Sequence, residues 1–409
     1  MQQSSKLLTD LFKAYYNARK NKRKSLDCLD FEMNYEKKLF QLYQEIINKQ
    51  YKISSSLCFI SFYPVKREIF AGNFRDRIVH HLIYSYLSPF FERLFINDSY
   101  SCRLKKGVSL GIKRLDHFIR SCSENYSQDC YVLKLDIKGY FMSIDREFLY
   151  KKVKKTVNHF EKELLIDKNL LLHLIRLTIF HNPTQHCHIR GNKEDWAGLP
   201  KSKSLFFTKK GKGLPIGNLT SQLFGNVYLN DFDHFVKNNL KCKYYGRYVD
   251  DMVFVHQDKN YLQSLIPQIK NFLEEKLDLE IHPNKIYLQH FNKGVGFLGV
   301  IIKPYRRYIG LRIKKSFFNK IIKWNKIIIN QNGELSEIQL KEFLAIINSY
   351  LGFFYKCSSY NLCVNCFYKN LSPYFTKYIC IERDCKKAIQ LSHFCGEKKN
   401  IHSIFCGSK

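Results

Sequence analysis

The sequence predicts an α+β fold whose C-terminal part is helical. Apolar runs bounded by polar turn residues predict strands at 131–137 and 244–256, the second with a tight turn at its centre. Apolar residues at helical spacing predict two consecutive helices at 314–329 and 337–355. Mixed helices and strands in the first part, followed by helices, are typical of an α+β protein built from packed layers.

Length and charge restrict the class of protein. The chain has 409 residues, which predicts two or three packed units. It carries 67 Lys and Arg against 36 Asp and Glu, a formal net charge of +31 that favours a polyanion such as nucleic acid as partner. Because the sequence contains no run of 18 apolar residues and no export signal, we expect no membrane association and a cytoplasmic location.

The other elements follow from the same periodicities. The predicted helices are 7–50 in part, 77–93, 109–122, 146–180, 219–237 and 262–277. Asn218 is the expected N-cap of the helix at 219–237, and a polar, loop-rich connection is expected at 183–213.

Composition divides the chain into four expected segments. A basic helical extension covers 1–50, and the body with the strands covers 51–312. A helical segment follows at 313–356, where Ser336 and Gln339 have the spacing of a capping box. A cysteine-rich tail covers 357–409.

Three carboxylates carry the chemistry. Asp250 and Asp251 stand at the turn of the hairpin, where like charges are costly unless a cation compensates them. Because Asp is common in turns, this pair alone is better explained as turn chemistry. Asp136, however, ends the apolar strand at 131–137, where an anion also needs a counterion. Together the three predict a shared cation site.

Phosphoryl transfer explains such a trio. Two divalent ions held together can stabilise both the attacking and the leaving oxygen of an in-line displacement. Mg²⁺ suits this task because it prefers carboxylate oxygens and keeps its other positions for water and phosphate, and Mn²⁺ is an alternative. No His or Cys lies nearby in the sequence, which agrees with a hard cation.

The motif Tyr248-Val249-Asp250-Asp251, with the upstream run Leu135-Asp136-Ile137-Lys138-Gly139-Tyr140-Phe141, resembles the palm of reverse transcriptases, notably bacterial retroelement enzymes. The resemblance covers residues 55–355 and implies a right-hand polymerase with fingers, palm and helical thumb. It implies RNA-directed DNA polymerase activity, with dNTPs, template RNA and cDNA as partners. It also implies metal binding by Asp136, Ile137, Asp250 and Asp251. Phe141 matches the aromatic gate against ribonucleotides, and ordinary core packing explains it equally well.

Basic residues match further parts of the family pattern. Arg67, Arg75 and Arg77 resemble the fingers residues that contact template and triphosphate, and guanidinium forks suit phosphates. Lys285 matches the palm lysine near the phosphates. The segment with Arg103, Lys105 and Lys106 resembles a fingers part close to the nucleic-acid backbone. In the thumb, Lys320, Lys323 and Lys326 alternate with Ile321, Ile322, Trp324 and Ile327, which indicates one basic face for nucleic acid and one apolar face.

The segment Gly213 to Gln222 indicates a subtype. Most reverse transcriptases have Gln before its second glycine and Pro after its serine, whereas this chain has Ile216 before Gly217 and Gln222 after Ser221. This resembles the enzymes of diversity-generating retroelements, where the segment shapes the nucleotide pocket and is linked to errors opposite template adenine. Loss of polar contacts at position 216 would lower discrimination between substrates. The alternative is that Ile216 is only a local packing variant.

Two alternatives remain beside this hypothesis. Reverse transcriptases of phage-defence systems share such motifs, and an RNA-binding, maturase-like protein would need no catalysis, although the intact aspartates argue against it. The resemblance further implies a structured template RNA and a small basic accessory protein.

The tail contains a possible zinc set. Cys363, Cys366, Cys380 and Cys385, with His393 and Cys395 beyond them, could supply four ligands. Their spacing is irregular, so we favour unliganded thiols over zinc. In a reducing compartment the 14 cysteines are expected as thiols or metal ligands, not as disulfides.

Overall fold

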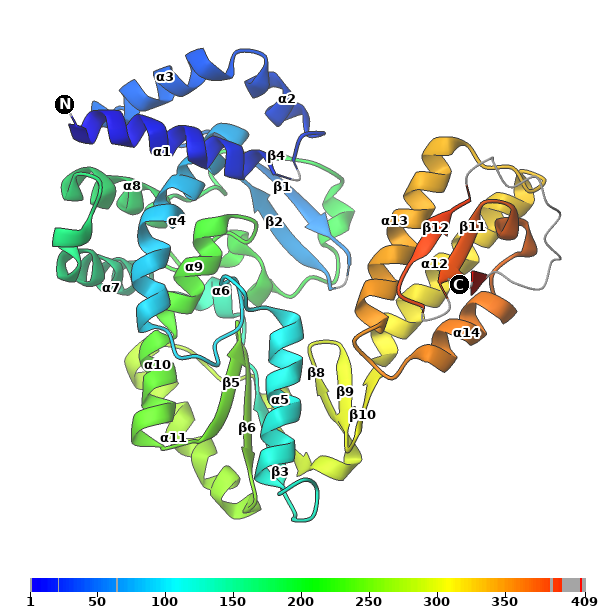
Figure 1. Cartoon of the computed structure of the whole chain (residues 1–409). Helices are drawn as coiled ribbons and strands as arrows, with labels where there is room; N and C mark the ends of the chain where they lie inside the picture. Colours follow the sequence, from blue (N-terminus) through cyan, green and yellow to red (C-terminus); the bar gives the residue numbers. More distant parts are fainter. Residues whose placement is uncertain (1, 21, 64, 383–384, 392–404, 407–409) are drawn as a thin grey trace. The chain divides into compact units, whose positions relative to one another are not determined.

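The computed structural model describes residues 2–20, 22–63, 65–382, 385–391 and 405–406 (Figure 1). The chain forms two compact units, each made of two stretches. The first unit comprises Met1–Gly111 and Leu133–Leu288, and the second comprises Ile112–Val132 and Gln289–Lys409. Within the described residues, every helix is too short or too polar to span a bilayer. Mixed helices and sheets confirm the predicted α+β class.

Three helices begin the first unit: α1 (Gln2–Arg19), α2 (Leu26–Glu32) and α3 (Tyr35–Ile47). Helix α1 packs against α4 (Phe74–Leu94), as Figure 1 shows. Its buried residues Leu7, Leu11, Ala14 and Tyr15 follow helical spacing, and Tyr15 meets Phe74 edge to face. The N-terminal extension is therefore packed onto the first unit through an apolar stripe.

A small sheet lies beside these helices, in the order β2-β1-β4. Strand β1 (Ser56–Ser61) runs antiparallel to β2 (Arg67–Ala71) and parallel to β4 (Cys187–Ile189). The predicted loop at 183–213 therefore contributes a strand. It also contains three short 3₁₀ turns at Lys193–Trp196, Lys201–Lys203 and Leu205–Phe207. The loop prediction missed this structure because the pairing partners lie more than a hundred residues upstream.

A second sheet has the order β5-β6-β3-β7. Its strands are β3 (Tyr131–Leu135), β5 (Tyr244–Tyr248), β6 (Asp251–His256) and β7 (Tyr287–His290). Strands β5 and β6 form the predicted antiparallel hairpin, with Tyr248 paired to Asp251 beside the turn. Helix α11 (Lys259–Leu277) contains the helix predicted at 262–277, and it packs on β6 with a buried apolar face.

The other helices are α5 (Val108–Cys122), α6 (Tyr140–Ser143), α7 (Arg146–His159), α8 (Lys168–Phe180), α9 (Leu219–Tyr228) and α10 (Asn230–His234). The single helix predicted at 219–237 is wrong, because it breaks at Leu229 and continues through α10 into a π turn at Phe235–Asn239. The apolar period persists across the break, so the sequence pattern did not reveal it.

The second unit contains a sheet of order β10-β9-β8, made of β8 (Val295–Phe297), β9 (Val300–Lys303) and β10 (Arg306–Ile309). The predicted helices appear as α12 (Leu311–Asn330) and α13 (Glu337–Phe354). The capping box at Ser336 and Gln339 is confirmed by both of its hydrogen bonds, of 3.2 and 3.0 Å.

The tail continues this unit with α14 (Tyr360–Lys369) and a sheet of order β12-β11-β13. The strands are β11 (Ile379–Glu382), β12 (Ala388–Gln390) and β13 (Phe405–Cys406). One hydrophobic core joins Phe317, Trp324 and Phe343 of the long helices to Cys363 and Phe375 of the tail. The tail and the helical segment before it therefore share a core.

Candidate catalytic site

The three predicted carboxylates lie at neighbouring strand ends of the four-stranded sheet. Asp136 directly follows β3, Asp251 begins β6, and β3 and β6 are adjacent strands. Asp250 stands in the turn between β5 and β6. All three side chains are partly exposed. Two segments that are more than a hundred residues apart in the sequence therefore meet at the ends of neighbouring strands in one sheet.

The carboxylates share one electrostatic environment. Burial, together with the negative charges of Asp136 and Asp251, raises the pKa of Asp250 to about 7. Burial also raises the pKa of Asp251, and the charge of Asp136 adds to that effect while Lys134 opposes it. The charge of Asp136 therefore makes ionisation of both Asp250 and Asp251 more costly, which is the situation that a bound cation relieves.

Lys285 supplies a cation to this group. Its Nζ donates to Oδ1 of Asp136 at 2.8 Å. The backbone beside it is also fixed, because the amide of His282 donates to the carbonyl of Asp136 at 2.8 Å and the amide of Lys138 donates to Glu280 at 2.9 Å. These two hydrogen bonds lie on either side of Ile137, and neither of them involves the Ile137 carbonyl. The predicted palm lysine and the first aspartate are therefore direct partners.

The donor chemistry fits a hard divalent cation, because the three side chains offer only carboxylate oxygens. In the part of the chain that the structure describes, however, no group of three or more His, Cys, Asp and Glu side chains is arranged as a metal site. The ion pair between Lys285 and Asp136 accounts for one of the oxygens that such a site would use.

The turn before the aspartates is held by a buried arginine. Val249 has a φ of 57°, which is rare for a β-branched residue. Nη1 of Arg247 donates to the Val249 carbonyl at 2.8 Å. Two further bonds, of 2.8 and 2.6 Å, join Arg247 to Asp233, and neither side chain of this pair is exposed. Sequence reasoning missed this pair, although an arginine inside an apolar strand was an available signal.

Phe141, Ile216 and Gly217, which the family resemblance assigns to nucleotide binding, lie close together. The amide of Phe70 in β2 donates to the carbonyl of Ile216 at 2.8 Å, and the amide of Leu214 donates to the carbonyl of Phe141 at 2.8 Å. Both side chains, Phe141 and Ile216, pack against the same small core. Gly217 has a φ of +130°, and a Cβ there would lie 2.8 Å from the Phe70 carbonyl oxygen. Gln222 is exposed on α9.

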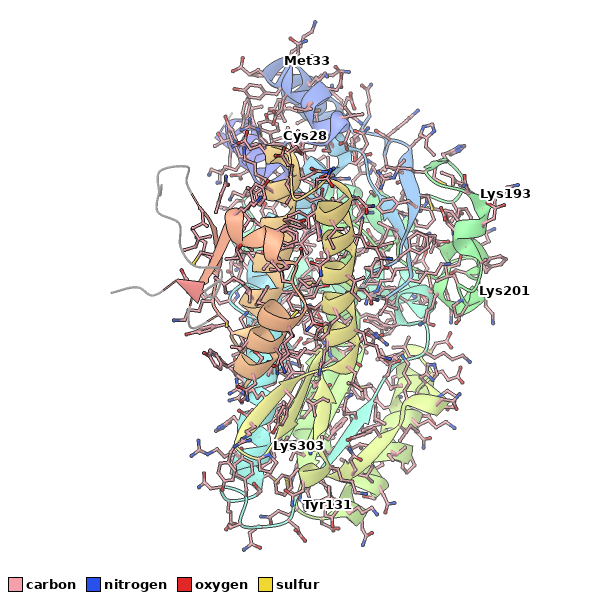
Figure 2. All side chains as sticks on the ribbon, turned by 90° about the vertical axis from the view of Figure 1, so that its right-hand side faces the viewer. Cys28, Met33, Tyr131, Lys193, Lys201 and Lys303 are labelled. Atoms are coloured by element: carbon pink, nitrogen blue, oxygen red, sulfur yellow. The ribbon has the colours of Figure 1, made fainter. Side chains whose placement is uncertain are left out.

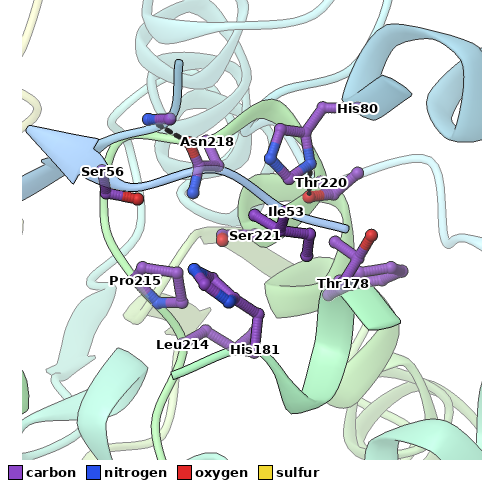
Figure 3. A pocket seen from close by; sticks show the side chains of 12 residues that line it. Ile53, Ser56, His80, Thr178, His181, Leu214, Pro215, Asn218, Thr220 and Ser221 are labelled. Atoms are coloured by element: carbon purple, nitrogen blue, oxygen red, sulfur yellow. Dashed lines mark hydrogen bonds between the residues drawn. The ribbon is translucent and has the colours of Figure 1, made fainter. Parts of the chain in front are cut away.

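A small enclosed pocket lies behind this segment (Figure 3). The Asn218 side chain accepts from the Gly72 amide at 3.2 Å, and Thr220 and His80 are hydrogen-bonded at 2.8 Å. Asn218 occupies the predicted N-cap position of α9, but its side chain makes no cap bond because it holds Gly72 instead. Burial lowers the pKa of His80 to about 3, so this ring is neutral. The hydrogen bonds around this pocket thus hold the segment that contains Asn218 and Thr220 against Gly72 and His80.

The predicted fingers arginines differ in their surroundings. Arg67 is exposed, and its charge lowers the pKa of Asp251, so it lies on the carboxylate side. The guanidinium of Arg75 pairs with Glu45 and donates to the Lys52 carbonyl at 3.0 Å. Arg77 donates to the Gly72 carbonyl at 2.8 Å. The structure therefore joins Arg67 to the site, while Arg75 and Arg77 bond to the protein itself.

The residues predicted to lie close to the nucleic-acid backbone, Arg103, Lys105 and Lys106, also differ in their surroundings. The side chain of Arg103 is only 5% exposed. Its guanidinium donates to the Glu92 carboxylate and to the carbonyls of Ile96 and Ser99. Lys106 donates to Asn97. Lys105 is exposed.

In the second unit, α12 buries Phe317, Ile321, Trp324 and Ile328. Lys323 and Lys326 are exposed, and Lys320 is partly exposed. Ile322 was assigned to the apolar face, but it is 51% exposed because it lies one residue outside the buried stripe.

Three cysteines of the predicted zinc set are buried in the core of the second unit. They are Cys363, Cys366 and Cys385, each in the thiol form, and burial raises the pKa of Cys366 to about 12. A hydrogen bond with Cys385 raises the pKa of Cys363. Cys380 is disulfide-bonded, which differs from the expectation that all cysteines are thiols or ligands. His393 and Cys395 lie outside the described residues.

Comparison with known families gives one domain match. The family model described as "Reverse transcriptase (RNA-dependent DNA polymerase)" matches residues 66–302, more than half of the chain. Protein YkfC of Escherichia coli (strain K12) is 22% identical over 272 residues, which cover 58% of this chain and 64% of that protein. The putative COX1/OXI3 intron 2 protein of Saccharomyces cerevisiae is 23% identical over 278 residues, 59% of this chain and 32% of that protein. The chain thus spans less than two thirds of either relative.

Solved structures with similar folds include telomerases. Apo telomerase from Candida tropicalis, truncated from the C-terminal domain, has a TM-score of 0.44 and 13% identity, covering 66% of this chain and 59% of that chain. Telomerase from Candida albicans in complex with a TWJ fragment of telomeric RNA has a TM-score of 0.43 and 12% identity, covering 77% of this chain and 60% of that chain.

Proposed function

The chain belongs to the reverse transcriptase family, and we propose that it is an RNA-directed DNA polymerase that extends a primer with dNTPs on an RNA template. The observation that carries this proposal is the position of Asp136 and of Asp250 and Asp251 at adjoining strand ends, where the charges of the other two aspartates raise the pKa of Asp250. The net charge of +31 suits a nucleic-acid substrate.

Asp136, Asp250 and Asp251 are the residues that would hold two Mg²⁺ or Mn²⁺ ions. Reverse transcriptase domains use divalent ions, which would neutralise the phosphate oxygens and lower the pKa of the primer hydroxyl. Lys285 presents its ammonium group beside Asp136 and Arg67 presents its guanidinium near Asp251. Both can attract and orient the triphosphate of a dNTP. Phe141, packed against Gly225 of α9, would exclude the 2′-hydroxyl of a ribonucleotide.

Primer extension tests the proposal. The full chain, a labelled DNA primer on an RNA template, dNTPs and Mg²⁺ or Mn²⁺ should give extended products, and Asp250→Ala should abolish them. Asp231→Asn removes an exposed carboxylate of the same unit and should retain activity. Extension by Asp250→Ala at the wild-type rate would refute the catalytic assignment.

We further propose that this polymerase is error-prone at template adenines, in the manner of diversity-generating retroelements. The support is Ile216, an apolar residue whose carbonyl is held by Phe70 and whose side chain packs in the core beside Phe141. Sequencing of the cDNA should give misinsertions concentrated at adenines, and Ile216→Gln should reduce them. Uniformly high fidelity would remove this subtype. A structured template RNA and a small basic accessory protein belong to the same proposal.

A phage-defence role is the alternative within the same chemistry. A target gene carrying a near-repeat of the template region, beside this gene, favours the retroelement, and its absence favours defence. The alternative of an RNA-binding, maturase-like protein requires that Asp250→Ala leaves the biological phenotype unchanged while charge reversal of Lys320 and Lys323 abolishes RNA binding.

A further inference from the structure

Residues 184–212, called the arm below, connect α8 to α9 and are anchored to β2 by a buried carboxylate. Glu68 is 1% exposed and accepts three hydrogen bonds from the arm. The donors are Nε1 of Trp196 at 2.7 Å, Oγ of Ser204 at 2.8 Å and the amide of Leu205 at 2.6 Å. Because a buried carboxylate satisfied by three donors fixes all of them, the arm is an ordered part of the first unit.

Apolar packing reinforces this anchor. Leu205 of the arm is buried with Cys58, Phe70 and Met142, and Trp196 packs against the same cluster. At the edge of β1, the amide of Arg190 donates to the Cys58 carbonyl at 2.8 Å. The arm is thus attached both to the small sheet and to the segment that follows β3.

The arm also lies against the turn after Asp136. Gly139, three residues after Asp136, has a φ of +55°, and a Cβ there would lie 2.5 Å from the carbonyl oxygen of Ser202. Directly after the arm, the amide of Gly213 donates to the Ile144 carbonyl at 2.8 Å, which joins the chain there to the same segment. The exposed residues Lys201 and Lys203 flank Ser202. Lys201 and Lys203 are therefore held next to the segment that follows Asp136.

The surface of the arm is basic and aromatic. Its sequence contains seven Lys and Arg residues and two acidic residues, which gives a net charge of +5. The basic residues are Arg190, Lys193, Lys201, Lys203, Lys209, Lys210 and Lys212, all but the last exposed. Phe206 and Phe207 are 40% and 61% exposed, and Nζ of Lys201 lies 5.5 Å from the Phe207 ring centroid. Figure 2 shows the side chains of Lys193 and Lys201 projecting outward.

We propose that the arm binds single-stranded RNA next to the catalytic carboxylates. Charges spread over many residues match a phosphate backbone better than a single triphosphate, and exposed rings beside lysines stack on unpaired bases. The choice of RNA over DNA, and the identity of this RNA as the template, rest on the proposed function. The binding of a single strand does not.

Lysine replacement tests the binding. The double variant Lys201→Glu/Lys203→Glu should bind a labelled single-stranded RNA about tenfold more weakly in fluorescence anisotropy, with no dNTPs present. The slope of log Kd against log salt should become shallower by roughly 1.4, because two phosphate contacts at about 0.7 each are lost. The matched control is Lys259→Glu/Lys276→Glu, which changes two exposed lysines of α11 and should leave affinity within about twofold.

Phe207→Ala separates stacking from charge. It should weaken RNA binding about tenfold without changing the salt slope, because a lost base stack releases no counterions. A single-stranded DNA and an RNA duplex of the same length should each bind less tightly than the single-stranded RNA. Equal affinities for all three would refute the RNA assignment.

Two results would overturn the proposal: wild-type affinity in the arm variant, or an equal loss in the α11 control. Thermal unfolding of each variant shows whether it is folded, and Phe207→Ala serves if the double variant is not. Asp250→Ala should bind RNA normally while failing to extend a primer. A failure of the arm proposal is therefore distinguishable from a failure of the polymerase proposal.

Discussion

Nη1 of Arg247 donates to the carbonyl oxygen of Val249 at 2.8 Å, one residue before the paired aspartates. The side chain of Arg247 is fixed by its two hydrogen bonds to Asp233. Its backbone is fixed as well, because its amide donates to the Asp98 carbonyl at 2.8 Å and its carbonyl accepts from the Tyr100 amide at 2.9 Å. The position of Asp250 and Asp251 is therefore set by a buried ion pair beneath the turn.

Loss of this ion pair should destabilise the first unit. Arg247→Met leaves the carboxylate of Asp233 buried without its partner, which should cost about 3–5 kcal/mol of unfolding free energy. Urea unfolding measures this change. The double variant Arg247→Met/Asp233→Leu removes the orphaned charge and should recover part of the loss. If the double variant were less stable than the single variant, the ion pair would not be the cause.

Backbone strain at Val249 should be relieved by glycine. Its φ of 57° disfavours a β-branched side chain, so Val249→Gly should raise the unfolding free energy by about 1 kcal/mol. The matched control is Val253→Gly in β6, which is buried in an ordinary strand and should be destabilised. Losses of equal size in both variants would show that the turn is not strained.

The sequence predicted those parts of the site that depend on local pattern. The apolar runs before Asp136 and around Asp250 are strands, and adjacency in one sheet brings these residues together. The capping box at Ser336 was equally local. The strands and the capping box each depend only on residues that are close in the sequence, whereas the adjacency of β3 and β6 is a long-range contact.

Local sequence patterns did not predict the long-range contacts. The bond from Asn218 to Gly72 spans 146 positions, and the bonds from the arm to Glu68 span 128 to 137 positions. Nothing in the local sequence distinguishes Glu68 from a solvated glutamate. For the same reason, Arg75 and Arg103 looked like phosphate ligands although Glu45 and Glu92 pair with them.

The raised pKa of Asp250 predicts a pH-dependent stability of the metal-free protein. Because the folded pKa of about 7 lies above the usual 3.8, the stabilising contribution is present at low pH and lost as pH rises through 7. Asp250→Asn cannot ionise, so its melting temperature in EDTA should exceed that of the wild type by an amount that grows between about pH 4 and pH 7, the interval between the unfolded and the folded pKa, and then stays constant. Added Mg²⁺ should reduce the difference. A constant difference across this range, as expected for Asp231→Asn, would contradict the assignment.

Gly217 should be irreplaceable for steric reasons as well as for its backbone angle. Gly217→Ala places a Cβ 2.8 Å from the Phe70 carbonyl and should shift the Ile216 segment, lowering primer extension at least about tenfold. Gly198→Ala is the matched control, because its φ of +75° is also strained but nothing lies within 4 Å of the new Cβ. The control should lose only about 1–2 kcal/mol of stability and retain its activity. Equal losses of activity would indicate that strain alone is responsible.

The anchor at Glu68 should control the order of the arm. Glu68→Ala leaves the donors of Trp196, Ser204 and Leu205 without their buried acceptor, at a cost of about 1–3 kcal/mol for each donor that stays buried. Release of the arm avoids this cost, so trypsin should cleave after Lys201 and Lys203 much faster in the variant, as mass spectrometry of the fragments would show. Trp196→Phe removes one of the three hydrogen bonds and keeps an aromatic ring in the core. Its cleavage rate should therefore lie between those of the wild type and of Glu68→Ala. If Glu68→Ala resisted trypsin as the wild type does, apolar packing around Leu205 alone would hold the arm.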